Sequence, residues 1–478
     1  MRYNIIRLIT AVALFVCVLI SLLTLQDHAL FYQEQHSLFL FSREYYHHII
    51  HWEGPLAYIG AFMVQFYYYP WLGASIVAAM LTCIYLMIES IIFRLTGKRD
   101  LFQLGVIAAV ALYFTLDDIE DSPAWVAISF VGLGLIWIAI RIIFRKRNGK
   151  ILQQSLKTWQ IIMPLALCAI YIFVGFKLEM KDYNREERAM IRAERAVKKG
   201  NWDEAIEITS QYLSTGRVNR LMLYLRNIAL AEKGELIDHL FDFPQKVGAN
   251  SLAFPWRRNS RETEHGHWAH EITGDINAAH QWAFEGMTVW GETAQYLRNL
   301  GRYNVALGRP EVAKKFADKL GQSLFYKKEA EKIRREARGD EPNELRYAVP
   351  DSVTINWVNI YDFRPNLFQN YKADPDNKIT RQYLIAAMLM SNSLNELMPI
   401  LNSEDMKSRN IREAVFLYTL DPKAKPLSDF GLEWDEATAQ EFSGFYSLLK
   451  RGMYNELEGK YGNTFWYYKH ILYKPEIK

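Results

Sequence analysis

The apolar residues of this chain are distributed very unevenly. Several long apolar runs lie between Ile5 and Phe176, and none follows in the roughly three hundred residues after Lys177. A helix rises about 1.5 Å per residue, so a run of about twenty residues can cross the ~30 Å hydrocarbon core of a bilayer. The sequence therefore predicts a multi-pass membrane protein that carries a large soluble domain.

Five apolar segments have lengths near that of a membrane-spanning helix. The third has only sixteen residues, which a locally thinned bilayer can accommodate. Residues 55–69 are also mostly apolar, but this stretch ends at Pro70 and is more typical of an interfacial or re-entrant helix than of a crossing. We therefore expect a transmembrane domain over residues 1–177, with spans at 5–25, 70–93, 101–116, 122–144 and 161–177.

The positions of lysine and arginine predict how these spans are oriented. Such side chains stay in the cytoplasm because moving them across the bilayer during insertion is unfavourable. With five crossings and a cytoplasmic N-terminus, the outer loops contain Arg43 alone before the last span. The cytoplasmic segments then contain Arg2, Arg7, Arg94, Lys98, Arg99, Arg141, Arg145, Lys146, Arg147, Lys150 and Lys157. After an odd number of crossings the soluble domain should lie outside the cytoplasm, in the periplasm if the host is Gram-negative.

Composition excludes several other classes of protein. The formal net charge is +3, which is too small for the clustered basic face that nucleic-acid binding requires. All three cysteines, Cys17, Cys83 and Cys168, fall inside apolar runs, so the soluble half has neither a disulfide framework nor a cysteine metal site. We expect no nucleic-acid partner and no cofactor.

The soluble half contains a recurring turn signal. Within the segment from Lys198 to Glu207, Gly200 is followed by Trp202 and Ala205. This segment resembles the turn between the two helices of a tetratricopeptide repeat, where glycine permits the turn and a small alanine packs five residues later. The resemblance implies a stack of helical hairpins, because one hairpin alone cannot bury its apolar face.

Glycines recur near the ~34-residue period of that repeat family. Gly200, Gly234, Gly274 and Gly308 are separated by 34, 40 and 34 residues. Further residues at repeat packing positions are Ala279, Gly301 and Ala313. The match has gaps, since His239 stands where the second unit should have alanine and residues 241–261 interrupt the array.

An unrelated bundle of antiparallel helical hairpins is the alternative to tetratricopeptide-like repeats. Under either interpretation we expect an all-α fold that begins with a transmembrane helix bundle. After it we expect a helical-repeat α-solenoid over 178–337, an irregular connector over 338–377, and helical hairpins with a cap over 378–478.

Three histidines, His265, His267 and His270, form a candidate metal site because their imidazoles lie close together in sequence. They lack the pair of histidines at i and i+4 with an intervening glutamate that marks a zinc-protease helix. Surface or packing roles at the start of a repeat helix are therefore favoured.

The predicted outer loops contain acidic side chains that suggest an alternative function. Polytopic glycosyltransferases that use lipid-linked sugar donors carry an acidic residue in the first outer loop, and some bear tetratricopeptide repeats after their spans. Similarity to them would assign catalysis to carboxylates that bind a divalent cation or act as a base. The candidates are Glu44, Glu53, Asp117 and Asp118. Five spans are few for that superfamily, so solvated loop acids are favoured.

Residues 53–73 carry a further resemblance. The stretches EGPLAYIGAF (53–62) and QFYYYPWLG (65–73) resemble a family of uncharacterised membrane proteins from Bacteroidetes. That resemblance implies a Gram-negative inner membrane, a multi-span N-terminal region and a long helical C-terminal part, without an assigned activity. We expect a scaffold rather than an enzyme, held in the lipid bilayer, whose periplasmic repeats bind a protein or peptide of the envelope.

Overall fold

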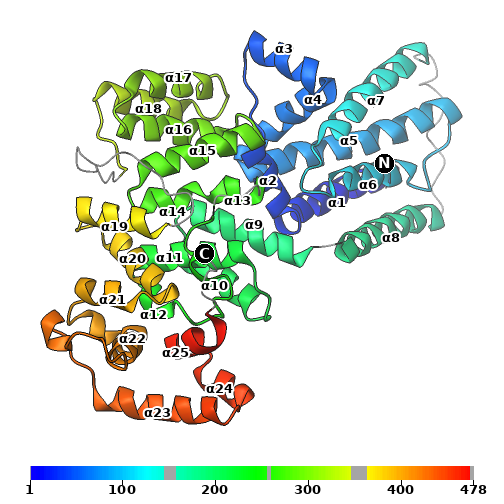
Figure 1. Ribbon diagram of the computed structural model, residues 1–478. Coiled ribbons are helices and arrows are strands. Elements are labelled where there is room, and N and C mark those ends of the chain that lie inside the picture. Colours follow the sequence, from blue (N-terminus) through cyan, green and yellow to red (C-terminus); the bar gives the residue numbers. More distant parts are fainter. Residues whose placement is uncertain (1, 145–157, 183, 256–259, 346–362, 474–478) are drawn as a thin grey trace. The chain divides into compact units, whose positions relative to one another are not determined.

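The computed structural model describes residues 2–144, 158–182, 184–255, 260–345 and 363–473 (Figure 1). These residues form helices and connecting turns without a β-strand, which confirms the expected all-α fold. The chain divides into two compact units. Unit 1 comprises Met1–Arg185, Glu292–Arg298 and Phe316–Lys332, and unit 2 comprises Glu186–Gly291, Asn299–Lys315 and Ile333–Lys478.

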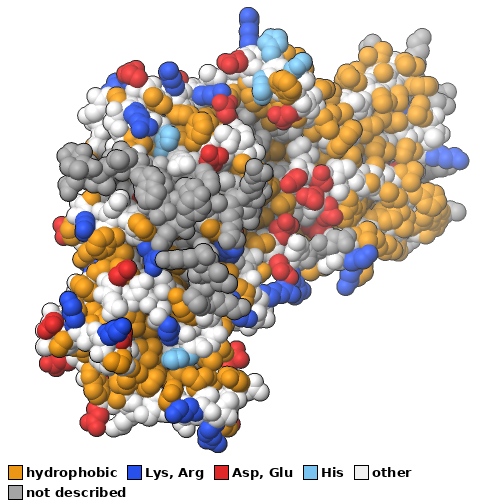
Figure 2. Space-filling model, viewed as in Figure 1, with side chains coloured by type: hydrophobic (Ala, Val, Ile, Leu, Met, Phe, Trp, Pro, Cys, Tyr) orange, Lys and Arg blue, Asp and Glu red, His pale blue; other side chains and the backbone are white. Residues whose placement is uncertain are grey.

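Four helices of unit 1 are long and apolar enough to cross a membrane. They are α1 (Arg2–Thr24), α5 (Pro70–Thr96), α7 (Ala124–Ile143) and α8 (Trp159–Asp182), which cover the spans expected at 5–25, 70–93, 122–144 and 161–177. On α7, Leu135 and Ile142 are 64% and 68% exposed. Hydrophobic side chains cover much of the visible face of α5 and α7 (Figure 2). Such a surface is unfavourable in water and suits contact with lipid.

The segment expected to form the third span, 101–116, contains a shorter helix. α6 (Leu104–Tyr113) and the 3₁₀ turn η2 (Phe114–Leu116) together fall short of a standard crossing. The helix starts late because Gln103 adopts a left-handed conformation with φ of 55°, which interrupts helical geometry. By length alone, the described residues thus contain four candidate spans where five were expected.

Polar contacts show that α1, α6 and α8 run in the same direction. Near their C-terminal ends, Ser21 and Tyr113 donate hydrogen bonds to the Glu179 carboxylate over 2.9 and 2.8 Å. Further back along α8, the Tyr171 hydroxyl donates to the carbonyl oxygen of Phe102, just before α6, over 3.1 Å. Hydrocarbon offers polar groups no water, so neighbouring helices satisfy one another here.

Helices α5 and α7 run in the opposite direction. Arg7 near the start of α1 contacts Glu89 near the end of α5, with Nε and Oε2 2.9 Å apart. Trp137 near the end of α7 donates from Nε1 to the Oγ of Ser90, again near the end of α5, over 3.0 Å. The helices α1, α5, α6, α7 and α8 therefore alternate in direction along the chain.

Short helices connect α1 to α5. They are α2 (Asp27–His36), α3 (Arg43–Trp52), α4 (Pro55–Val64) and the 3₁₀ turn η1 (Gln65–Tyr68). Residues 55–69 thus form a ten-residue helix and a turn rather than one continuous long helix. Phe325, which also belongs to unit 1, stacks on Tyr68 with the ring centroids 5.3 Å apart.

From residue 185 onward the chain folds into helices joined by turns, coloured green to red in Figure 1. The first group is α9 (Arg185–Lys198), α10 (Trp202–Leu213), α11 (Arg220–Lys233), α12 (Leu236–His239), α13 (Ser260–His265), α14 (His267–Ile272), α15 (Ile276–Trp290), α16 (Ala294–Ala306), α17 (Pro310–Leu320) and α18 (Lys327–Arg338). The second group is α19 (Arg364–Ala373), α20 (Lys378–Met390), α21 (Leu394–Leu397), α22 (Arg409–Thr419), α23 (Glu436–Lys450), α24 (Tyr454–Tyr461) and α25 (Phe465–Tyr467). Helix α19 lies within the connector expected to be irregular, 338–377, of which residues 346–362 are outside the described residues.

The turn glycines adopt the conformation that a helix-ending turn requires. Gly200, Gly234, Gly274 and Gly308 have φ values of 69°, 81°, 77° and 69°. This left-handed region is disfavoured by residues with a Cβ atom, so glycine lets one helix stop and the next turn back.

Small residues allow the helices of unit 2 to pack closely. Ala205, Ala279 and Ala313 have no exposed surface. A Cβ atom at Gly301 would lie 3.1 Å from side-chain carbons of Ile333, so glycine permits the close approach of α16 and α18. Trp202 packs against the main core of the unit. Stacked helical hairpins of this kind are common to both interpretations of the sequence.

One hydrophobic core joins the first helices of unit 2 to its C-terminal hairpins. It contains Tyr224 of α11, Tyr383 of α20 and Trp466 of α25. The Tyr468 hydroxyl donates to the carbonyl oxygen of Met390 over 2.6 Å. The aromatic run from Phe465 to Tyr468 is at most 7% exposed at every position, so it closes the end of this core.

Candidate functional site

A groove lined mainly by polar and charged residues, with a volume of about 560 Å³, lies in unit 2 between α12, α20 and α22. Its walls come from three parts of the chain that are far apart in sequence: the turn after α11 together with α12, one side of α20, and the loop that leads into α22 together with the start of that helix. The lining residues are Gly234, Ile237, Asp238, Lys378, Arg381, Gln382, Asn402, Glu404, Asp405, Lys407, Ser408 and Ile411.

Two side chains of α20 hold the walls of this groove in place. Arg381 donates to both carboxylate oxygens of Asp405 over 2.9 and 2.6 Å, and these hydrogen bonds raise the pKa of Arg381. The side-chain amide of Gln382 donates to the Ala231 carbonyl and accepts from the Leu236 N–H, each over 3.3 Å. The groove is therefore preformed and does not need a ligand to assemble it.

Exposed charges of both signs surround the groove. Lys378 and Asp238 are exposed, and Lys407 forms an ion pair with Glu404. A peptide backbone presents both donors and acceptors, so a groove of mixed polarity suits it better than it suits a strongly anionic ligand.

The three histidines considered as metal ligands face different partners. His265 Nε2 lies 3.2 Å from a Glu194 carboxylate oxygen. His267 Nδ1 lies 3.0 Å from the Tyr303 hydroxyl, and His270 Nδ1 lies 3.6 Å from Asp275. The three imidazoles thus face different side chains of unit 2, and among the described residues they do not form one group that could hold a metal ion.

His265 belongs instead to a buried group that includes two glutamates. Ligand atoms of Glu194, Glu264 and His265 all lie within 4.8 Å of one another, and no other such group is found in the described part of the chain. Arg261 donates to Glu194 over 2.6 Å and to Glu264 over 2.8 Å. Glu264 is adjacent to His265 in sequence and could have been noticed, but Glu194 lies on α9 and gives no sequence signal.

The outer-loop acids considered for catalysis lie on the surface. Glu44, Glu53, Asp117 and Asp118 are all exposed. Asp118 accepts a hydrogen bond from the backbone N–H of Glu120 over 3.0 Å, as expected in a turn. None of the four belongs to a group close enough to hold a metal ion among the residues that the structure describes.

Comparison with protein-family models assigns the chain to a protein family. The model described as "Family of unknown function (DUF6057)" matches residues 1–176 and 146–472. The chain belongs to the DUF6057 family. This match confirms the expected membership of an uncharacterised family. No curated protein and no solved structure matches the chain.

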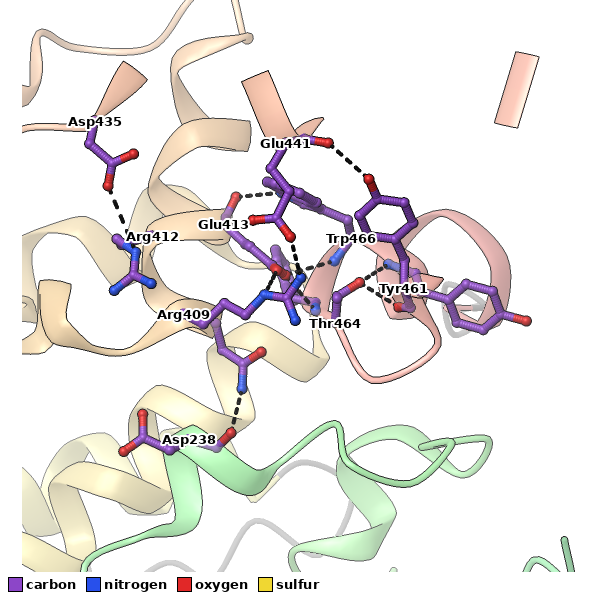
Figure 3. Close-up of polar contacts among 12 residues, drawn as sticks. Asp238, Arg409, Arg412, Glu413, Asp435, Glu441, Tyr461, Thr464 and Trp466 are labelled. Atoms are coloured by element: carbon purple, nitrogen blue, oxygen red, sulfur yellow. Dashed lines mark hydrogen bonds and ion pairs between the residues drawn. The ribbon is translucent and has the colours of Figure 1, made fainter. Parts of the chain in front are cut away.

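A further buried carboxylate of this DUF6057 chain, Glu413, has a structural role (Figure 3). Its Oε2 accepts from the backbone N–H groups of Phe465 and Trp466 over 2.8 and 3.4 Å. Its Oε1 lies 2.9 Å from Arg409 Nε. Glu413 thereby satisfies backbone groups at the start of α25, which have no partner within that helix. Burial raises the pKa of Glu413 to about 7.

Protonation of Glu413 should make the stability of the DUF6057 chain depend on pH. The pKa of an unperturbed glutamate is 4.5 and that of folded Glu413 is about 7, so the folded state binds this proton more tightly. The contribution is therefore present below pH 4.5 and is lost as the pH rises towards 7. Thermal unfolding midpoints of the wild type and Glu413→Gln, measured in detergent from pH 4.5 to 8, should diverge across this window.

A suitable control is Glu433→Gln, because Glu433 is an exposed carboxylate in the loop before α23. Its midpoint should follow that of the wild type at every pH. Parallel curves for the wild type and Glu413→Gln would contradict the raised pKa.

Proposed function

We propose that this DUF6057 protein is an inner-membrane scaffold whose helical array binds a peptide segment of an envelope protein. The groove between α12, α20 and α22 is the observation that carries the proposal. It is preformed, it has a volume of about 560 Å³, and it offers donors and acceptors of both charges. Concave surfaces of stacked helical hairpins serve such recognition in general.

A periplasmic location of the array is part of the proposal. The alternating directions of α1, α5, α6, α7 and α8 support five passages, because α6 runs alongside α1 and α8 despite its length. A short helix can cross the membrane where the bilayer is locally thinner. Arg7 contacts the end of α5, close to the basic Arg94, Lys98 and Arg99, and positive residues favour the cytoplasmic side.

A reporter fused after Lys478 tests this location. Alkaline phosphatase should be active there, because it matures outside the cytoplasm. If only a cytoplasmic reporter is active, the periplasmic part of the proposal is wrong. Four passages, without a crossing by α6, would be one explanation of that result.

Site-specific photo-crosslinking in living cells tests the groove. A photoreactive amino acid at Lys378 or Lys407 should give a discrete adduct that mass spectrometry identifies as one envelope protein. The same residue at Glu207, exposed on α10 and outside the groove, should not give it. Asn402→Trp, which fills the groove, should remove the adduct at Lys407. An adduct that persists with Asn402→Trp, or none at either groove position, would contradict the proposal.

The glycosyltransferase-like alternative makes a different prediction. Combined alanine substitution of Glu44, Glu53, Asp117 and Asp118 should leave the adduct and the cellular phenotype unchanged if the protein is a scaffold. Loss of a glycan or lipid product at normal protein levels would favour the enzyme.

A further inference from the structure

The group of Glu194, Glu264 and His265 is unusually well buried for its charge. The side chains of both glutamates are 4% exposed and that of His265 is 1% exposed. Carboxylates in such surroundings require a cation nearby, because transfer from water into a medium of low polarity is costly for an isolated charge. In the described structure, the Arg261 guanidinium contacts both carboxylates.

His265 points to a ligand independently of the two glutamates. Among the described residues, neither of its ring nitrogens makes a hydrogen bond of acceptable geometry. Its Nε2 nevertheless points into the group, 3.2 Å from Glu194 and 3.7 Å from Glu264. The Trp268 ring lies 4.9 Å from the imidazole and restricts its orientation. A buried imidazole nitrogen directed at two carboxylates is suited to donate its lone pair to a cation.

We propose that Glu194, Glu264 and His265 bind one divalent zinc ion, which takes the place of the Arg261 guanidinium. One imidazole nitrogen and two carboxylate oxygens form a ligand set that zinc accepts, with a fourth position left for water. Ligand atoms around a tetrahedral zinc lie about 3.4 Å apart, given bonds of ~2.0–2.2 Å. The observed separations of up to 4.8 Å need only a modest contraction.

The Arg261 side chain can move away from the two carboxylates because it is only partly buried. Its side chain is 29% exposed, whereas the three ligands are nearly fully buried. A guanidinium brings one positive charge to the two carboxylates and zinc brings two. Arg261 therefore competes with zinc for the two carboxylates. Removal of Arg261 should thus strengthen zinc binding, which is not expected of an ion-pair network that binds no metal.

Zinc titration of the detergent-purified, metal-stripped full-length protein tests the proposal. The background should be His47→Gln/His51→Gln, because these exposed histidines of α3 are four residues apart and offer a separate surface site. In that background we expect binding of one zinc ion. Glu194→Gln and His265→Gln should each weaken it at least about tenfold. Arg261→Gln should tighten it several-fold, because the competing cation is gone.

His270→Gln is the matched control, since His270 is also buried but faces Asp275. It should leave the zinc affinity unchanged. Because Glu194→Gln could fail to fold, the cobalt-loaded parent protein provides a second measurement: X-ray absorption should show one imidazole among nitrogen and oxygen ligands. Weaker binding by Arg261→Gln, wild-type binding by His265→Gln, or no imidazole ligand would each overturn the proposal. The test does not depend on the peptide groove.

Discussion

Replacing Trp466 with alanine should lower the free energy of local unfolding of the C-terminal hairpins by about 3–5 kcal/mol, the range for removing a buried aromatic side chain. Trp466 has no exposed surface, and its ring centroid lies 5.2 Å from that of Phe442 and 5.9 Å from that of Phe445. Its Nε1 also donates to the Glu413 carbonyl over 3.0 Å. Truncation therefore leaves a cavity and an acceptor without its donor.

Hydrogen–deuterium exchange can measure this effect without assuming that the whole protein unfolds in one step. Peptides from α22 to α25 should lose protection in Trp466→Ala, and Trp466→Phe should lose less because the ring is partly retained. Tyr454→Ala is a suitable control, since Tyr454 is 58% exposed. Equal protection in Trp466→Ala and the wild type would show that the aromatic run does not close the core.

Replacing Arg7 with leucine should destabilise the helix bundle of unit 1 by about 3 kcal/mol, since breaking a buried ion pair costs roughly 3–5 kcal/mol. We expect a loss at the lower end of this energy range because the Arg7 side chain is 37% exposed, whereas that of Glu89 is 4% exposed. The substitution removes the cation that lies 2.9 Å from the Glu89 carboxylate. Unfolding in mixed detergent micelles, compared with the wild type, measures the loss.

The double variant Arg7→Leu/Glu89→Leu separates the charge effect from a packing effect. It should recover most of the loss, because neither member of this ion pair is then left as an unpaired charge. Ser75→Ala is a control on α5, since the Ser75 hydroxyl bonds only to a carbonyl one turn earlier in its own helix, among the described contacts. A double variant less stable than Arg7→Leu would contradict this account.

Local signals in the sequence predicted where the helices lie better than they predicted how those helices pack together. The apolar runs and the turn glycines act within a few residues, so the long helices α1, α5, α7 and α8 and the turn at Gly200 follow from pattern alone. Hydropathy does not register the left-handed Gln103, so the helix within the expected span 101–116 begins only at Leu104. Similarly, Glu179 fell outside the expected span at 161–177, although α8 continues to Asp182.

The candidate sites depend on contacts between distant residues, which a single sequence does not reveal. The groove unites residues near 236, 380 and 405, each unremarkable in its own segment. The histidine run drew attention to residues 265–270, yet His265 meets Glu194 from α9 rather than the neighbouring histidines. Side chains become partners through packing of the hairpins, and the sequence pattern specifies only that such packing occurs.

The hydrogen bond between Ser21 and Glu179 joins residues 158 positions apart. During translation, α1 therefore enters the bilayer long before the ribosome has produced its partner in α8. Until the last apolar helix is inserted, the hydroxyl groups of Ser21 and Tyr113, which lie 2.8 Å apart in the complete structure, lack the Glu179 carboxylate as acceptor. A chain arrested before that point would expose these hydroxyl groups in lipid without the carboxylate. Membrane quality control could recognise this feature and so distinguish unfinished molecules from finished ones.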